Sequence, residues 1–178
     1  MKPWLFEDLT QFLDEITIQT IGEIGTHKGN TSIQLIKYLS KKEKNIVFHG
    51  YDIFDYAKGN VEFNRKEMNG KGGASFEFVK NRLDKLKESI TNFDFILYKG
   101  LTQDTLKNQT FDFVYIDGGH SYETVKHDYS MVKESKLIVF DDAVNKINAS
   151  QVAMFLKELE SDKEIEYYKR WAIIRNYA

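Results

Sequence analysis

Short apolar runs alternate with amphipathic stretches along the chain. Five runs are rich in β-branched and aromatic residues and predict strands, over residues 18–24, 46–51, 93–98, 111–116 and 137–140. Around them, apolar residues recur at helical spacing, which predicts helices over residues 3–16, 30–39, 76–90, 122–132 and 152–159. Residues 165–168 and 171–174 predict a closing hairpin. This alternation is typical of an α/β fold, in which a parallel sheet carries helices on both faces.

The strand predicted over residues 111–116 carries the strongest indication of a functional site. It is apolar enough to be buried on both faces, as a central strand of a parallel sheet is. Directly after it come the residues Asp117-Gly118-Gly119-His120-Ser121. The strand predicted over residues 137–140 likewise ends in Asp141 and Asp142. Because the carboxyl ends of parallel strands meet at the edge where such sheets bind ligands, these acids predict a site for a cation or a cationic ligand.

Composition narrows the classes of function. The 178 residues, 42% of them hydrophobic, are enough to build the core of one domain over residues 1–178. A net charge of −2 and a pI near 6.1 argue against nucleic acid or an anionic membrane as a partner. Without cysteine there is neither a disulfide nor a thiolate metal site. The chain begins without a basic-then-apolar signal and has no apolar run of about 18 residues, so we expect a cytoplasmic protein.

A glycine-containing turn follows the first predicted strand. The stretch Glu23-Ile24-Gly25-Thr26-His27-Lys28-Gly29 has the spacing E-x-G-x-x-x-G, and Asn30 or Thr31 is expected to cap the helix after it. Glycine permits a sharp turn there and lets backbone N–H groups approach a ligand. Asp52 ends the next predicted strand, where folds of this kind hydrogen-bond a ribose diol. Together, the turn and this acid favour a bound nucleoside.

The same turn argues against a dinucleotide. The dinucleotide fingerprint is G-x-G-x-x-G, in which the second glycine admits the pyrophosphate. Here Thr26 and His27 stand where that glycine would fall, and Glu23 places a carboxylate two residues before Gly25. A carboxylate repels pyrophosphate but suits a ligand with an amino group or a sulfonium. The turn therefore favours S-adenosylmethionine (SAM) over NAD.

These motifs resemble those of class I SAM-dependent methyltransferases. The stretch Ile116-Asp117-Gly118-Gly119-His120-Ser121-Tyr122 and the terminal Asp141-Asp142 are similar, more specifically, to the metal-dependent branch with macrocin-type sugar O-methyltransferases and cephalosporin-hydroxylase-like proteins. The resemblance covers residues 17–178. It implies a Rossmann-like fold with a seven-stranded, mostly parallel sheet and an antiparallel C-terminal strand. It also implies cofactor contacts from Glu23, Gly25, Thr26, Gly29, Asp52, Thr102 and Asp117, and metal ligands at Asp117, Asp141 and Asp142.

Converging carboxylates need a compensating charge. Two of them about 4 Å apart repel by roughly 4 kcal/mol at an effective dielectric near 20, which a proton, a lysine or a metal can offset. Oxygen ligands without cysteine favour a hard divalent cation, above all Mg²⁺. Alternatively, one of Asp141 and Asp142 caps a helix and the other faces water. His120, on the same loop as Asp117, is a candidate general base, or else only hydrogen-bonds the backbone.

Residues 55–75 are predicted to form a lid. The segment holds four glycines at the expected ligand edge and can close over a substrate. Its basic residues suggest a phosphate or acidic-glycan acceptor, but Glu62 and Glu67 interleave with them. This mixture of charges is typical of a solvated loop.

The sequence thus predicts a SAM-dependent methyltransferase that uses a divalent cation to methylate a hydroxyl of a small molecule or sugar. Asp117 and His120 are the predicted catalytic residues. Neither nucleic acid nor membrane is expected as a partner, and a homo-oligomer is compatible with the sequence. Two alternatives remain open: a catalytically silent SAM-binding subunit of a partner enzyme, and a nicotinamide-dependent oxidoreductase, which the turn disfavours.

Overall fold

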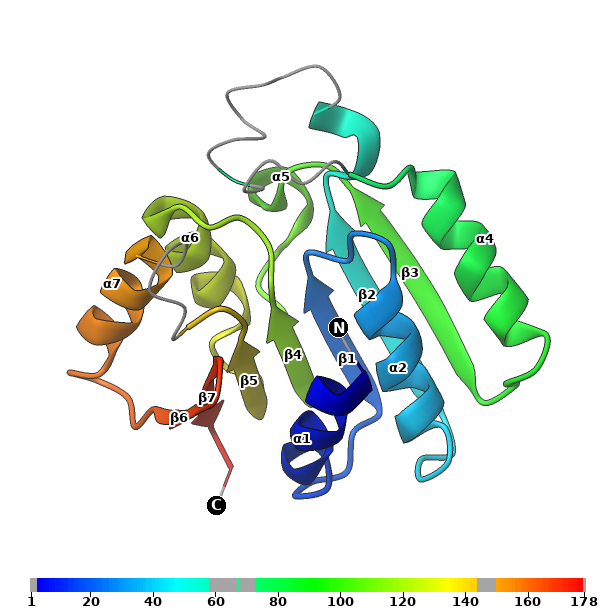
Figure 1. Cartoon of the computed structure of the whole chain (residues 1–178), viewed down its shortest axis with the longest axis horizontal. Coiled ribbons are helices and arrows are strands. Elements are labelled where there is room, and N and C mark those ends of the chain that lie inside the picture. The colour runs from blue at the N-terminus through cyan, green and yellow to red at the C-terminus, as the bar shows by residue number, and fades with distance from the viewer. Residues whose placement is uncertain (1–2, 58–66, 68–72, 144–149, 178) are drawn as a thin grey trace.

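Seven strands form one sheet in the order β3-β2-β1-β4-β5-β7-β6 (Figure 1). The structure is a computed structural model that describes residues 3–57, 67, 73–143 and 150–177. The strands are β1 (Thr20–Ile24), β2 (Ile46–Asp52), β3 (Phe93–Lys99), β4 (Phe113–Ile116), β5 (Leu137–Phe140), β6 (Glu166–Tyr168) and β7 (Trp171–Arg175). The first five are parallel, whereas β7 runs antiparallel to both β5 and β6. The predicted sheet and its antiparallel C-terminal hairpin are therefore confirmed.

Helices cover both faces of this sheet (Figure 1). They are α1 (Pro3–Leu13), α2 (Asn30–Leu39), the 3-10 helix η1 (Phe54–Ala57), α4 (Phe76–Lys87), α5 (Thr102–Thr105), α6 (Tyr122–Val132) and α7 (Ser150–Leu159). Buried side chains of α1, α2 and α4 share one apolar cluster with the sheet, and those of α6 and α7 share another. Among the described helices, none is both long and apolar enough to cross a membrane.

The central strands separate these two clusters. Along β4, Phe113 and Tyr115 belong to the cluster of α1, α2 and α4, while Val114 and Ile116 belong to that of α6 and α7. All four side chains are buried, as are those of β5. The continuous apolar runs of the sequence are thus explained by burial on both faces, as predicted.

Several boundaries differ from the predictions. The first strand begins at Thr20 rather than residue 18, and the carboxylate of Asp112 accepts hydrogen bonds from the N–H groups of Gln19 and Thr20, both at 2.9 Å. A side-chain cap from Asn30 or Thr31 was the wrong expectation for α2. Its N-cap is Gly29, in the left-handed conformation and without a side-chain hydrogen bond. Most of the predicted lid, residues 58–66 and 68–72, lies outside the described residues.

Candidate active site

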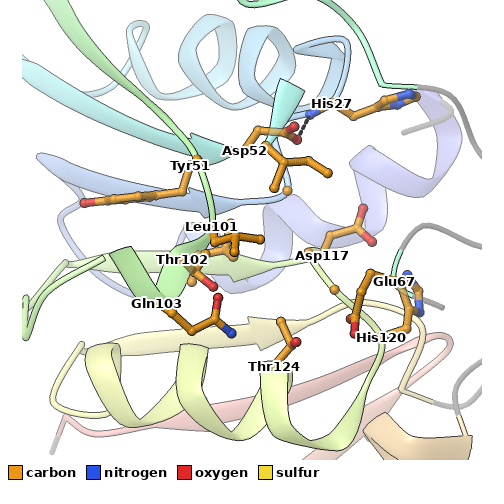
Figure 2. Close-up of a pocket in the computed structure, with 16 residues that line it drawn as sticks. His27, Tyr51, Asp52, Glu67, Leu101, Thr102, Gln103, Asp117, His120 and Thr124 are labelled. Atoms are coloured by element: carbon orange, nitrogen blue, oxygen red, sulfur yellow. Dashed lines mark hydrogen bonds between the residues drawn. The ribbon is translucent and has the colours of Figure 1, made fainter. Parts of the chain in front are cut away.

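A cavity of about 380 Å³ opens at the carboxyl ends of the parallel strands. Its walls come from the turn after β1, the end of β2, the start of α5 and the loop after β4 (Figure 2). From β1 the chain adds β2 and β3 on one side, and then continues with β4 and β5 on the other side. The strand order therefore reverses between the adjacent strands β1 and β4. Open α/β sheets bind their ligands at such a switch point.

The turn after β1 joins three strand ends. Gly25 donates its N–H to the carbonyl of Tyr51 at 2.8 Å, and the N–H of Asp117 bonds the carbonyl of Ile24 at 2.8 Å. Gly25 has a φ of +93°, and a Cβ there would lie 2.0 Å from the carbonyl oxygen of Asp117. Any side chain would therefore push the ends of β1 and β4 apart, which explains the glycine of the motif.

Asp52 faces the cavity from the end of β2. Its carboxylate accepts the backbone N–H of His27 at 2.7 Å, the dashed line of Figure 2, and that of Phe54 at 2.5 Å. Burial raises the pKa of Asp52, while these two hydrogen bonds oppose the shift. The carboxylate is thus held in one orientation by the main chain and keeps lone pairs for a ligand.

The predicted cofactor residues divide into two groups. Gly25, Asp52, Thr102 and Asp117 line the cavity. The other three are buried and lie outside its lining; they are Glu23, Thr26 and Gly29. Thr26 and Gly29 hold the turn together, since the Gly29 N–H donates to the Thr26 carbonyl at 2.8 Å.

Glu23 is buried beneath the turn, with 1% of its surface exposed. Its carboxyl accepts a hydrogen bond from the hydroxyl of Ser32 on α2. Burial raises the pKa of Glu23 to about 8, so the group is mostly uncharged at neutral pH. In the folded protein Glu23 therefore carries too little negative charge to repel a pyrophosphate as the sequence predicted.

An acid–imidazole cluster lies at the other end of the cavity. Ligand atoms of Asp117, His120 and Asp142 all lie within 4.8 Å of one another. Figure 2 shows Asp117 and His120 together at this end, away from Thr102. Asp141, the remaining predicted metal ligand, is not in the group. Its carboxylate instead pairs with Arg170 and accepts the Tyr115 hydroxyl.

The comparisons with known proteins agree with this geometry. A family model described as a methyltransferase domain matches residues 23–143, more than half of the chain. The chain belongs to this methyltransferase family. A search of curated proteins finds no significant match.

Solved structures similar to this methyltransferase are also methyltransferases. A TDP-rhamnose 3'-O-methyltransferase of calicheamicin biosynthesis has a TM-score of 0.68 and 16% identity, over 100% of this chain and 82% of that one. The O-methyltransferase TomG of Streptomyces achromogenes, solved with SAM, has a TM-score of 0.62 and 15% identity, over 98% of this chain and 80% of that one. A methyltransferase of Podospora anserina with bound SAH has a TM-score of 0.57 and 14% identity, over 98% of this chain and 77% of that one. The predicted class I fold is confirmed; the macrocin-type branch stays a prediction.

Two residues of the methyltransferase's site were missed by the sequence reasoning. Glu67 is 8% exposed and lines the cavity, where its carboxylate accepts the N–H of Ser121 at 3.2 Å. The expectation of a solvated Glu67 is therefore wrong. The N–H it accepts lies at the start of α6, where a carboxylate is favoured by the unpaired donors and the helix dipole. Arg170 comes from the turn between β6 and β7 and pairs with both Asp141 and Asp142. No local pattern around Glu67 or Arg170 signals these contacts.

Proposed function

We propose that the methyltransferase transfers the methyl group of SAM to a hydroxyl of a small molecule or sugar. The observation that carries the proposal is one continuous cavity with Asp52 at one end and the pair Asp117 and His120 at the other. Its volume, about 380 Å³, is within the range of roughly 300–1,000 Å³ for small-molecule sites. Donor and acceptor must meet in one enclosed space for the transfer to be efficient.

In this proposal the cofactor's adenosine lies against the ends of β2 and β3. Asp52 accepts hydrogen bonds from the ribose hydroxyls, with its two oxygens already oriented by backbone N–H groups. Ile53 and Leu101 supply apolar contacts to the base, and the Thr102 hydroxyl offers it a polar one. The turn at Gly25 lets the chain pass close to the cofactor.

The acceptor hydroxyl is proposed to lie between the cofactor and His120. The His120 imidazole takes the hydroxyl proton as the oxygen attacks the methyl carbon. The new bond joins oxygen and methyl, the bond from methyl to sulfur breaks, and the electron pair stays on the sulfur of the demethylated product, SAH. The protein's main contribution is alignment of the two reactants.

The acid cluster fits a divalent cation. Asp117 and Asp142 provide oxygen ligands of the kind that Mg²⁺ and Mn²⁺ prefer, and all ligand atoms of the cluster lie within 4.8 Å. Asp141 is not in this group, so we propose Asp117 and Asp142 as the ligands and keep His120 as the base. A bound cation would lower the pKa of a coordinated acceptor hydroxyl.

Calorimetric titration tests the cofactor. SAM and SAH are expected to bind the wild-type protein, and NAD is not. Radiolabelled SAM with a panel of sugar, phenol and hydroxy-acid acceptors then tests methyl transfer, with excess EDTA in a parallel series. Binding of NAD in place of SAM would overturn the assignment. Binding of SAM without methyl transfer to any acceptor would indicate a silent subunit. Full activity in excess EDTA would overturn the proposed role of the cation.

A further inference from the structure

Arg170 places a guanidinium against both acids that follow β5. Its Nε forms an ion pair with Asp141 Oδ1, and its Nη2 donates to Asp142 Oδ1. Both aspartates are 8% exposed, so their charges are largely removed from water. Such acids require a proton, a metal or a basic partner. The structure supplies the basic partner from within the chain.

The position of Arg170 is fixed by the residues on either side of it. The N–H of Ala143, the residue after the two acids, donates to the Arg170 carbonyl at 2.8 Å. Trp171 is fully buried, and its indole N–H donates to the Tyr115 hydroxyl at 3.3 Å. That hydroxyl in turn bonds Asp141. The guanidinium is thus anchored by backbone and side chain on the same edge of the sheet.

Asp117, Asp141 and Asp142 differ in their partners. Asp141 Oδ1 accepts the N–H of Asp142 at 2.8 Å and pairs with Arg170, and Asp141 is not in the group with Asp117 and His120. Asp142 commits Oδ1 to Arg170 and still belongs to the group with Asp117 and His120. Asp142 is therefore shared between a guanidinium and the proposed cation site.

We propose that Arg170 is the resident counter-cation of this acidic cluster and sets how tightly the cluster binds a divalent cation. The inference rests on the proposed function, because it concerns the same cation site. With all three acids ionised, three carboxylates and one guanidinium leave a formal charge of −2, which a divalent cation brings to zero. Arg170 also competes for one oxygen of Asp142. It keeps the apo cluster stable at the expense of cation affinity.

The test is the Mn²⁺ affinity of the apo protein, measured by calorimetry and by electron paramagnetic resonance. Arg170→Gln should bind Mn²⁺ about tenfold more tightly than wild type or better, because one positive charge is removed a few ångströms from the ion. Arg170→Lys retains the charge and should stay within about threefold of wild type. A purely structural role for Arg170 predicts the opposite, with equal or weaker Mn²⁺ binding in Arg170→Gln.

Arg175→Gln is the matched control. Arg175 ends β7, the strand that follows Arg170, and also pairs with two acids, Glu15 and Glu166, away from the cluster. Its substitution should leave Mn²⁺ affinity unchanged, and an equal gain would overturn the inference. If Arg170→Gln does not fold, the double variant Arg170→Gln/Asp141→Asn removes the buried pair together and is less disruptive. Its formal charge matches wild type, so tighter Mn²⁺ binding reports the freed oxygen of Asp142, and equal or weaker binding refutes the competition.

Titration with SAH separates this inference from the proposed function. Suppose that wild type binds SAH, but that wild type and Arg170→Gln bind Mn²⁺ equally well or not at all. This result refutes the role of Arg170 and leaves the proposed function standing. Wild type that does not bind SAH refutes the proposed function, whatever the Mn²⁺ result. Tight Mn²⁺ binding that appears only in Arg170→Gln supports the inference most directly.

Discussion

The two halves of the ligand-binding edge, at β1 and β2 and at β4 and β5, are held together by different kinds of contact. The half at β1 and β2 relies on the main chain: Gly25 donates to the Tyr51 carbonyl, and two backbone N–H groups orient Asp52. The half at β4 and β5 relies on charged side chains: Asp142 is grouped with Asp117 and His120 and also pairs with Arg170. Backbone contacts define a fixed shape, whereas a cluster of charges responds to the ions and protons around it. We propose that the first half binds the cofactor and that the second carries out the chemistry.

Buried acids in the two halves also avoid the cost of desolvation differently. Glu23, beneath the turn, accepts a hydrogen bond from the Ser32 hydroxyl and holds a proton, because burial raises the pKa of its carboxyl to about 8. Asp141 and Asp142 are paired with Arg170. Both solutions remove an unpaired buried charge. They differ in what disturbs them, since pH acts on the first and substitution of the arginine on the second.

The largest effect is expected from the chemical half. His120→Ala should reduce methyl transfer by about 10²–10⁴-fold, the usual contribution of a general base, with SAH affinity unchanged. Single-turnover assays and calorimetry on the same preparation measure the two quantities. His127→Ala is a suitable control, because His127 lies on α6 outside the cavity lining. Loss of Mn²⁺ affinity in His120→Ala would instead make this imidazole a metal ligand.

An intermediate effect is expected from the buried proton. Because the native state holds a proton on Glu23 between pH 4.5 and about 8, while the unfolded chain has lost it, stability falls as the pH rises through this window. Glu23→Gln keeps a hydrogen-bond partner for Ser32 and removes the group whose ionisation makes stability fall with pH. The variant should gain unfolding free energy over wild type above pH 8, on the order of a few kcal/mol, and converge with it below pH 4.5.

Urea unfolding of both proteins across this range measures the difference. Glu15→Gln provides a contrast of opposite sign, because hydrogen bonds from Arg175 lower the pKa of Glu15. The stability that this acid contributes is lost as the pH falls rather than rises. Parallel curves for wild type and Glu23→Gln would mean that Glu23 is charged in the folded protein, and the contrast between the two halves would fail.

The smallest effect is expected from the binding half. Asp52→Ala should weaken SAH binding by about tenfold, roughly the 1.4 kcal/mol of one lost hydrogen-bonding group, with a smaller effect on the rate at saturating SAM. Asp55→Ala is the control, since Asp55 lies three residues later, is exposed and pairs with Lys99. A loss of rate at saturating cofactor as large as that of His120→Ala would contradict the division of labour.

Local signals predicted most of the fold and part of the site. Residues 137–140 form a short, continuous apolar run without helical spacing, which is typical of a central strand, and the structure buries all four. Gly25 and Asp52 were recognisable because a turn and a strand end are local features. The position of Glu67 in the cavity lining was not recognisable from the sequence. Its carboxylate is buried because it contacts the start of α6, which is far along the chain.

The sequence by itself determined the order of the strands and of the five longer helices, the glycine turn after β1 and the acids at the ends of β2, β4 and β5. Only the tertiary structure decided the charge state and the partners of those acids. It buried Glu23 beneath the turn, so that the carboxyl keeps its proton, and it brought Arg170 to Asp142 across 28 residues. It also left Asp141 outside the group that joins Asp117, His120 and Asp142. Desolvation and pairing depend on every neighbour in space, and most of those neighbours are distant in sequence.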